Sequence, residues 1–218
     1  MIRPEAKPGL VLLAGDLHAF PIKRSDWYVI VAADRGAIHA LEQGILPDRV
    51  IGDFDSLPRE HIEAIERAGV PVKRLPVDKN LTDGEACIEH AISVGADPIV
   101  VAGGLGGRFD HVLGNVLLLA RIREAGRTGW ATDGRQRVYF LEDALTVPGE
   151  PGDLLSLIPL TSVLTGVTLT GARWTLDGDT LYFGSTRGLS NEFVDPRITL
   201  PATSGRALVV TTPRRYIS

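Results

Sequence analysis

RVIGDFDSLP, Arg49 to Pro58, joins a short apolar run to two aspartates, Asp53 and Asp55, that stand two positions apart. The first part of the stretch is typical of a strand in a parallel sheet, ending where a polar loop begins. Two carboxylates placed this close repel each other unless a cation lies between them. The stretch therefore predicts a strand of an α/β sheet and, beyond its carboxyl end, a site for a divalent ion.

The same alternation of short apolar runs and helix-like patterns extends from the N-terminal region to about Thr128. This order favours a mainly parallel sheet with crossover helices. We expect strands at Leu10–Ala14, Tyr28–Ala33, Arg49–Ile51, Val70–Leu75 and Pro98–Ala102. We expect helices at Gly36–Gly44, Pro58–Gly69, Thr82–Gly95 and His111–Ala125. Thr82 followed three residues later by Glu85 is a capping-box pattern, which marks the start of the third helix.

After Thr128 the pattern changes to many short strands separated by turns such as GEPGD and DGD. Strands at this spacing indicate a sandwich or a barrel. We therefore expect an α/β domain with a mainly parallel sheet at 1–128, followed by an all-β, sandwich-like domain at 129–218. The change of pattern lies within the segment 126–137.

The composition argues against several classes of partner. The chain has 218 residues and a net charge of −4, which argues against a broad basic surface for nucleic acid or anionic lipid. No apolar run approaches the roughly 20 residues that cross a bilayer. The opening MIRPEAKPG is unlike a secretory signal, and the lone Cys87 cannot form an internal disulfide. A cytoplasmic location is expected.

Aspartates follow each expected strand of the first domain. Ligands of open parallel sheets bind beyond the carboxyl ends of the strands, where loops and helix N-termini converge. The aspartates at these exits are Asp16, Asp34, Asp53, Asp55, Asp78, Asp83 and Asp110. Mg²⁺ prefers oxygen ligands and commonly bridges carboxylates to substrate phosphates, so this edge of the sheet is a candidate site for a metal and a phosphate-bearing ligand.

A purely structural interpretation of the same residues stays open. Asp and Ser at strand exits also cap helices and form turns. Thr82 followed by Asp83 is ordinary chemistry for the first turn of a helix. The combination of the Asp53–Asp55 pair with the other strand-exit carboxylates is what favours a functional site.

A glycine-rich segment, AGGLGGRFDH at Ala102–His111, is the second candidate element. Its glycines let backbone N–H groups approach an anion closely, and the helix that follows adds its dipole. Arg108 offers a guanidinium suited to phosphate oxygens. The segment has neither the P-loop pattern nor the dinucleotide-binding pattern, so it predicts a polyphosphate site of another kind.

Other chemistries have little support. The five histidines never fall at metal-ligand spacing, and His39, His61 and His90 have the pattern of helix-surface residues. Cys87 lies in a helix pattern and is expected in the core. Trp174 is a candidate for stacking on a ring.

Five segments together carry a family resemblance. They are ADRGA (33–37), PDRVIGDFDS (47–56), DKNLTDGEACIEHA (78–91), GGLGGRFDHVLGNVLLL (103–119) and GSTRGLSNEF (184–193). In order and spacing the chain resembles the thiamine pyrophosphokinases, also called thiamine diphosphokinases, from about Leu10 to the C-terminal strand. GDFDS, GGRFDH and LSNE together are specific to that family, whereas ADRGA alone is not.

The resemblance implies a transferase that moves the diphosphoryl group of ATP to the hydroxyethyl oxygen of thiamine, giving thiamine diphosphate and AMP. It also implies an ATP- and Mg²⁺-binding α/β domain, a β-sandwich that contributes to thiamine binding, and a homodimer. The implied catalytic and metal residues are Asp53, Asp55, Asp83 and Asp110. The implied ATP-binding residues are Asp34, Asp78, Lys79, Thr82, Gly106, Gly107 and Arg108. Ser190 and Asn191 are the implied thiamine contacts.

Two positions depart from the family pattern, and two alternatives to the function stay open. Asn80 replaces a frequent carboxylate, and Ile38 stands where many relatives have asparagine. A diphosphokinase for another heterocyclic alcohol, such as a hydroxymethylpterin, is one alternative. A non-catalytic thiamine or nucleotide sensor is the other. Which aspartate serves as the base, Asp55 or Asp83, is not decided by the sequence.

Overall fold

The computed structural model describes residues 6–54, 57–76 and 80–217. The chain divides into two compact units, residues 1–134 and residues 135–218. The domain boundary predicted between residues 128 and 129 stays a prediction. The strand that follows it, β6 (Gly129–Thr132), pairs with a strand of the first unit.

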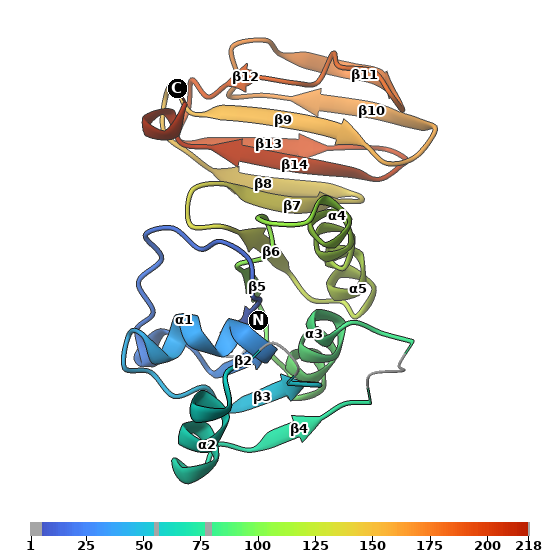
Figure 1. The fold of residues 1–218 in the computed structure, drawn as a ribbon. Coiled ribbons are helices and arrows are strands. Elements are labelled where there is room, and N and C mark those ends of the chain that lie inside the picture. Colours follow the sequence, from blue (N-terminus) through green and yellow to red (C-terminus); the bar gives the residue numbers. More distant parts are fainter. Residues whose placement is uncertain (1–5, 55–56, 77–79, 218) are drawn as a thin grey trace. The chain divides into compact units, whose positions relative to one another are not determined.

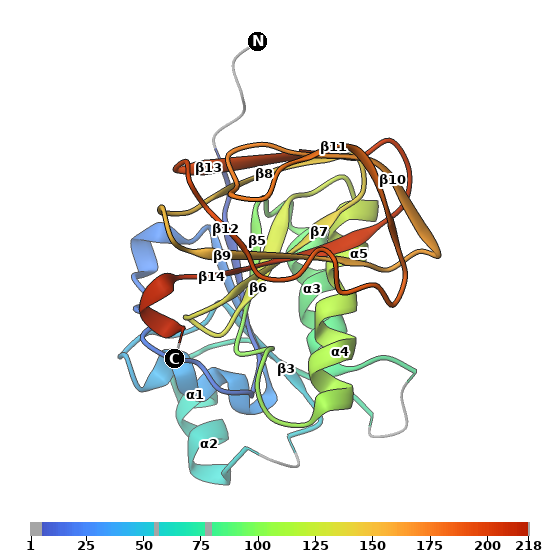
Figure 2. The same cartoon turned by 90° about the horizontal axis from the view of Figure 1, so that it is seen from above.

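The first unit is built on six parallel strands, so the expected α/β class is confirmed (Figures 1 and 2). Their order across the sheet is β6-β5-β1-β2-β3-β4. Besides β6, the strands are β1 (Gly9–Leu12), β2 (Val29–Ala33), β3 (Arg49–Gly52), β4 (Val72–Arg74) and β5 (Ile99–Ala102). Each expected strand of this unit is present. Strands β1, β2, β4 and β5 are shorter than predicted, and β3 is one residue longer.

Continuous apolar runs form these strands because both faces of the sheet are covered. Every residue of β1, β2 and β5 is buried. On one face, Leu10, Ile30 and Val50 share a hydrophobic core with Ala37 of helix α1 (Ala37–Leu41) and Ile65 of helix α2 (Arg59–Arg67). The opposite face is covered by helix α3 (Asp83–Ser93), which contacts β1, β2, β3 and β5.

The helices follow the sequence pattern with one correction. They are η1 (Arg24–Asp26), η2 (Asp34–Gly36), α1 (Ala37–Leu41), α2 (Arg59–Arg67), α3 (Asp83–Ser93), α4 (Phe109–Leu117) and α5 (Leu119–Glu124). The cap of α3 is confirmed, since the Thr82 hydroxyl accepts a hydrogen bond from the Glu85 N–H at 3.1 Å. The single helix expected at His111–Ala125 is wrong in detail, since the helical segment begins earlier, at Phe109, and ends at Glu124. It is interrupted at Leu118, whose carbonyl accepts from the Arg121 N–H at 3.0 Å in a tighter, three-residue turn.

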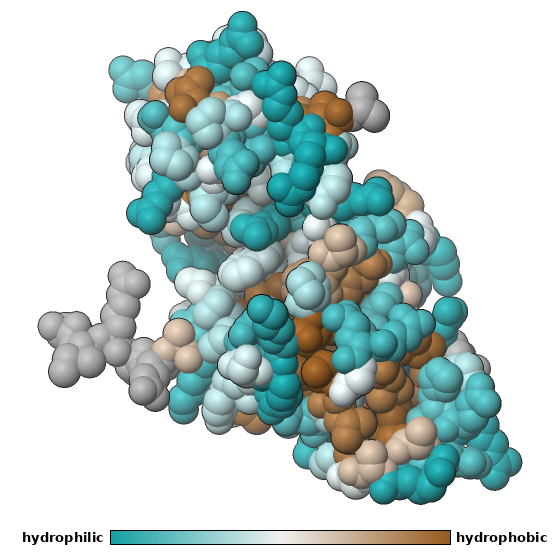
Figure 3. Space-filling view, turned by 90° about the vertical axis from the view of Figure 1, so that its left-hand side faces the viewer, coloured by the Kyte–Doolittle hydropathy of each residue, from teal (hydrophilic) through white to brown (hydrophobic). Residues whose placement is uncertain are grey.

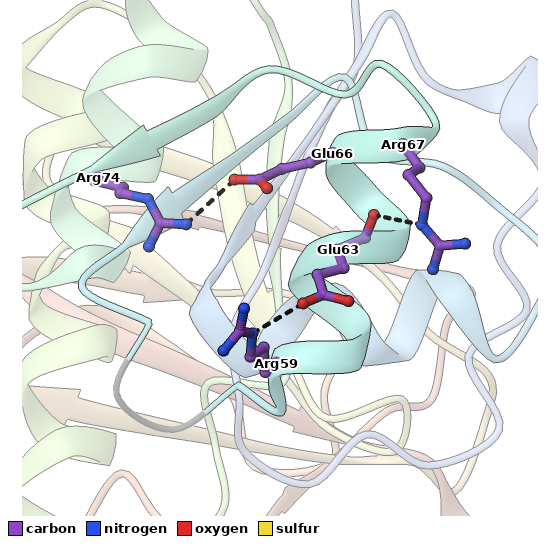
Figure 4. A network of polar contacts seen from close by, with 5 residues as sticks. All are labelled: Arg59, Glu63, Glu66, Arg67 and Arg74. Carbon is purple, nitrogen blue, oxygen red and sulfur yellow. Dashed lines mark hydrogen bonds and ion pairs between the residues drawn. The ribbon is translucent and has the colours of Figure 1, made fainter.

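Charged side chains of helix α2 contact one another and strand β4 at the edge of the sheet (Figure 4). Arg74 of β4 pairs with Glu66 at 3.2 Å, and within the helix Arg59 pairs with Glu63 at 2.8 Å. Arg67 donates to the Glu63 carbonyl at 3.1 Å. Such exposed pairs contribute little to stability each, and of the three contacts the Arg74–Glu66 pair is the one that joins the helix to the sheet.

The second unit consists of antiparallel strands, as expected for the C-terminal part (Figure 1). They are β7 (Arg137–Leu141), β8 (Ala144–Pro148), β9 (Leu154–Pro159), β10 (Val163–Leu169), β11 (Leu176–Tyr182), β12 (Asn191–Glu192), β13 (Arg197–Pro201) and β14 (Ala207–Thr212), followed by η3 (Arg214–Tyr216). Strand β14 pairs with β7 and β9, β9 pairs with β12, β10 with β11, and β13 with β8. Alternate residues of β9 and β13 are buried, which is the pattern of strands with one face on a core.

No helix in the described parts of the chain is both long and apolar enough to span a membrane. The single cysteine, Cys87, is buried in α3, in agreement with its predicted place in the core.

Candidate functional site

The carboxyl ends of the parallel strands all lie at one edge of the first unit, and polar residues follow them there. Asp16 follows β1, Asp34 follows β2 and Asp53 follows β3. Asp83 begins α3 after β4, and Asp110 lies in the first turn of α4 after β5. Asp55, Asp78 and Lys79, which the sequence also assigned to this site, lie outside the described residues.

A glycine brings the ends of β2 and β3 together. A Cβ on Gly52 would lie 3.0 Å from the Cβ of Asp34, so the absence of a side chain at position 52 lets the Asp34 backbone approach. Asp34 is buried and has a positive φ of 45°. Asp53 follows Gly52 directly, and therefore Asp34 and Asp53 leave the sheet side by side.

Strained backbone coincides with the expected site. Among the described residues, four that are not glycine have a positive φ: Ala19, Asp34, Phe54 and Ser190. Phe54 is a bulky residue with φ 64°, is buried, and has the Arg74 guanidinium 5.1 Å from its ring centre. Such conformations cost free energy and concentrate at binding and catalytic sites. Three of the four fall in elements that the sequence singled out: the end of β2, GDFDS and LSNE.

The glycine-rich loop after β5 lies against the loop after β1 so closely that side chains are excluded. The Gly15 N–H donates to the Gly103 carbonyl at 2.8 Å. A Cβ on Gly15 would lie 2.5 Å from the Gly103 oxygen, and one on Gly106 would lie 2.7 Å from Oδ2 of Asp16. Gly103 and Gly107 have φ values of 76° and 90°, which only glycine adopts readily. The sequence identified this loop, but not its partner after β1.

Arg108 and Asp110, predicted for ATP and for the metal, are bound to each other. The Arg108 Nε donates to Asp110 Oδ1 at 3.2 Å and its Nη2 to Oδ2 at 2.6 Å. Asp110 Oδ1 also accepts from the His111 N–H at 3.0 Å. The hydrogen bond from Arg108, followed by that from His111, lowers the pKa of Asp110, and the same pairing raises the pKa of Arg108. Both side chains are exposed, so Arg108 is accessible to an incoming anion.

A cavity of about 300 Å³ brings Thr82 and Asp110 together. Its lining includes Glu85 of α3 and His111 and Asn115 of α4. Asn115 was not predicted. Its Nδ2 donates to the Gly104 carbonyl at 3.4 Å, and its Oδ1 lies 3.5 Å from where a Cβ on Gly84 would be. An asparagine inside an apolar helix is a poor helix former, and this was the signal that the sequence offered.

The described residues do not by themselves make a metal site. No three His, Cys, Asp or Glu side chains within 6–54, 57–76 and 80–217 are grouped so that they could hold an ion. Asp110 is engaged with Arg108. The magnesium cluster of Asp53, Asp55, Asp83 and Asp110 therefore stays a prediction.

Asn191 in the second unit is buried, and its side-chain amide hydrogen-bonds the backbone of two other residues. Its Nδ2 donates to the Trp174 carbonyl at 2.6 Å, and its Oδ1 accepts from the N–H groups of Trp174 at 3.1 Å and Glu192 at 2.8 Å. Trp174 itself is exposed, with Arg173 5.1 Å from its ring centre. The neighbouring Ser190 is exposed, and its N–H donates to Ser156 Oγ at 3.1 Å. Of the two predicted thiamine contacts, Ser190 thus has the accessible side chain, and Asn191 supports an exposed ring.

Comparisons with known proteins follow the same division of the chain. Residues 23–128 match the family model described as thiamin pyrophosphokinase, catalytic domain, and residues 144–206 match the one described as thiamin pyrophosphokinase, vitamin B1 binding domain. A thiamine pyrophosphokinase of Bacillus subtilis is 28% identical over 207 residues, which are 91% of this chain and 92% of that protein.

Solved structures agree with the sequence comparisons. The crystal structure of thiamine pyrophosphokinase from Bacillus subtilis has a TM-score of 0.83 at 25% identity, covering 95% of this chain and 99% of that one. The structure of thiamin pyrophosphokinase from Geobacillus thermodenitrificans has a TM-score of 0.78 at 28% identity, covering 94% and 97%. The fold and both parts of the chain are therefore shared with these proteins.

Proposed function

Because this chain belongs to the thiamin pyrophosphokinase family, we propose that it transfers the diphosphoryl group of ATP to the hydroxyethyl oxygen of thiamine. The products are thiamine diphosphate and AMP. The observation that carries the proposal is the cavity that Thr82 and Asp110 line, with Arg108 bound to Asp110 at its edge. A hydroxyl, a carboxylate and an exposed guanidinium at the carboxyl edge of a parallel sheet suit a polyphosphate ligand.

In the proposed reaction, the thiamine hydroxyl oxygen forms a bond to the β-phosphorus of ATP. The bond between that phosphorus and the oxygen bridging to the α-phosphate breaks, and AMP leaves with the electron pair. The hydroxyl proton passes to a carboxylate, for which Asp55 and Asp83 are the candidates from the sequence. Positioning and charge stabilisation dominate reactions of this type.

The residues of the glycine-rich loop and of α4 have distinct proposed roles. The backbone N–H groups of Gly106 and Gly107 face the phosphates, as glycine permits. Arg108 exchanges its bond to Asp110 for bonds to phosphate oxygens and so offsets the charge that builds on the transferred group. Thr82 donates its hydroxyl to the same ligand, and Asn115 holds the loop through Gly104.

Mg²⁺ is part of the proposal because ATP-dependent transfer requires compensation of phosphate charge, which a bound divalent ion supplies. Asp53, Asp55, Asp83 and Asp110 are its proposed ligands, the last of them once Arg108 has turned to the phosphates. Asp34 and Asp78, with Lys79, complete the proposed ATP contacts, whereas Ser190 is the proposed direct contact to thiamine.

We also propose a cytoplasmic homodimer. Phe109, Leu113 and Leu117 are exposed by 78%, 44% and 42% and recur every four residues on α4, so they form one apolar stripe that a second copy of the chain would cover. Sedimentation equilibrium tests this part. A monomer at micromolar concentration would contradict it.

The central experiment is a turnover assay with ATP, Mg²⁺ and thiamine, in which AMP and thiamine diphosphate are both quantified by chromatography. We expect equal amounts of the two products and none without thiamine. A hydroxymethylpterin in place of thiamine is the control for the other heterocyclic alcohols. Product formation from the pterin but not from thiamine would contradict the proposal and indicate a diphosphokinase for another alcohol. Tight thiamine binding without any production of AMP would indicate a non-catalytic sensor.

A further inference from the structure

Phe54 has a backbone conformation that the function proposed above does not explain. The residue directly follows Asp53, one of the proposed metal ligands, and its φ of 64° lies in the left-handed region. This region costs free energy for a bulky side chain, because the Cβ atom approaches the following carbonyl oxygen. The conformation of Phe54 therefore persists only where contacts of its side chain offset that cost.

The ring of Phe54 belongs to the hydrophobic core of the first unit. Only 8% of the residue is exposed, and Val50 of β3, Leu57 and Ile65 of α2 are members of the same core. Hydrophobic residues gather on the side of the first unit where α1 and α2 lie (Figure 3). Burial in such a core is not directional, so it does not by itself select the left-handed conformation.

Arg74 supplies a directional contact to the same ring. Its guanidinium carbon lies 5.1 Å from the centre of the Phe54 ring, within the range of a cation–π interaction. Arg74 is the last residue of β4 and pairs in register with Gly52, two positions before Phe54. The Leu75 N–H donates to the Gly52 carbonyl at 2.8 Å. The end of β4 therefore holds both the backbone before Phe54 and the ring of Phe54.

Glu66 of α2 fixes the orientation of Arg74. Its Oε1 accepts a hydrogen bond from Arg74 Nη2 at 3.2 Å (Figure 4). The side chains of Arg74 and Glu66 are 58% and 49% exposed, so the pair contributes little to the free energy of unfolding. A guanidinium is planar, and it can pair with a carboxylate through its edge while its face covers an aromatic ring. The arrangement thus suits a role in orientation rather than in stability.

We infer that Arg74 is a positioning residue, which acts through the ring of Phe54 to keep Asp53 in the orientation that the reaction requires, and that Glu66 orients Arg74. The inference rests on the proposed function in giving Asp53 a role in diphosphoryl transfer. Neither Arg74 nor Glu66 lines the cavity assigned above to the polyphosphate, so the two residues act from outside it.

Steady-state release of AMP tests the inference. A cation–π interaction at an exposed site has the strength to change a rate roughly two- to fivefold, so Arg74→Ala should lower kcat by that factor and leave KM for ATP and for thiamine unchanged. In the Asp53→Asn background, Arg74→Ala should have no further effect on kcat, because Arg74 acts through Asp53. A wild-type kcat in Arg74→Ala, or the same loss in both backgrounds, would overturn the inference.

Arg59→Ala is the matched control. It removes the same charge from the other ion pair of α2, Arg59–Glu63, and should leave kcat at the wild-type value. Glu66→Gln should lower kcat in the same direction as Arg74→Ala and should have no further effect when the two are combined. A loss in Arg59→Ala equal to that in Arg74→Ala would show an effect of net charge and would contradict a positioning role.

An NMR measurement tests the turn without turnover. The amide and α protons of one residue lie closer together in the left-handed region than in the right-handed region, so Phe54 should give a strong nuclear Overhauser effect between them. This signal should weaken in Arg74→Ala and keep its wild-type strength in Arg59→Ala. An unchanged signal in Arg74→Ala would overturn the inference even if the chain makes thiamine diphosphate. A weakened signal in a chain that makes none would support the contact and refute the proposed function instead.

Discussion

Arg108 and Asp110 hold each other through two hydrogen bonds, of 3.2 Å and 2.6 Å, at the start of α4. The sequence predicts that Arg108 binds a phosphate and that Asp110 binds a metal ion. In the structure each satisfies the other, so an incoming polyphosphate has to compete with Asp110 for the guanidinium. The pair thus keeps both charges placed at the proposed site without a ligand.

The pH response of this pair can be tested directly. Arg108→Gln should raise the pKa of Asp110 toward its ordinary value, because the first cause of its lowered pKa is the hydrogen bond from Arg108. A carboxyl whose pKa is lowered by folding stabilises the folded chain at neutral pH, and that contribution is lost as the pH falls through the folded pKa. Carbon-13 NMR titration of labelled aspartate measures the shift. Arg121→Gln, which removes the partner of Glu89, should leave Asp110 unaffected, and an unchanged Asp110 pKa in Arg108→Gln would contradict the assignment.

Asp53→Asn should lower kcat by about 10²-fold or more, the scale of losing one group that stabilises charge in the transition state. Steady-state AMP release gives kcat, and thermal unfolding shows whether the fold is intact. Asp26→Asn changes an exposed aspartate in η1 and should behave as the wild type. Turnover near the wild-type rate in Asp53→Asn would remove this residue from the reaction.

Gly15→Ala should destabilise the chain by roughly 1–3 kcal/mol, as overpacking does. The added Cβ would lie 2.5 Å from the Gly103 carbonyl oxygen and 2.9 Å from that of Gly106, and these are backbone atoms that cannot rotate away. Denaturant unfolding measures the change, and a raised KM for ATP should accompany it.

Gly114→Ala is the control for stability, since nothing lies within 4 Å of its Cβ position. It should retain or gain stability, by up to about 1 kcal/mol. Equal stability of the two variants would show that the loops separate easily.

The variants Asn191→Ala and Ser190→Ala should have different effects although the residues are neighbours: the first lowers stability, and the second raises KM for thiamine. Removing the Asn191 amide leaves the backbone groups of Trp174 without their partners and should cost roughly 1–3 kcal/mol. Chemical unfolding followed by tryptophan fluorescence measures the loss. Ser190→Ala should leave stability unchanged, because the side chain is exposed, and should raise KM for thiamine. A KM for thiamine at the wild-type value would rule out Ser190 as a contact.

Local patterns predicted the elements of the first unit well. Buried apolar runs such as those of β1, β2 and β5 are strands wherever both faces of a sheet are covered, and the Thr82–Glu85 pattern marked the start of α3 correctly. The interruption at Leu118 was missed because the apolar sequence runs through it without a break, from Val116 to Leu119. Strand β6 was missed as a member of the parallel sheet because its four residues, GWAT, are too few and too varied in polarity to form a recognisable strand pattern.

The sequence by itself determined the alternation of strands and helices, the family, and the presence of polar residues after each strand of the first unit, because these depend on residue type and on neighbours along the chain. Only the tertiary structure decided which residues meet: Asp34 with Gly52, Asp16 with Gly106, and Asn191 with Trp174. Such contacts depend on strand order and on the close approach of separate loops. Those distances follow from how the whole sheet packs, which no single segment specifies.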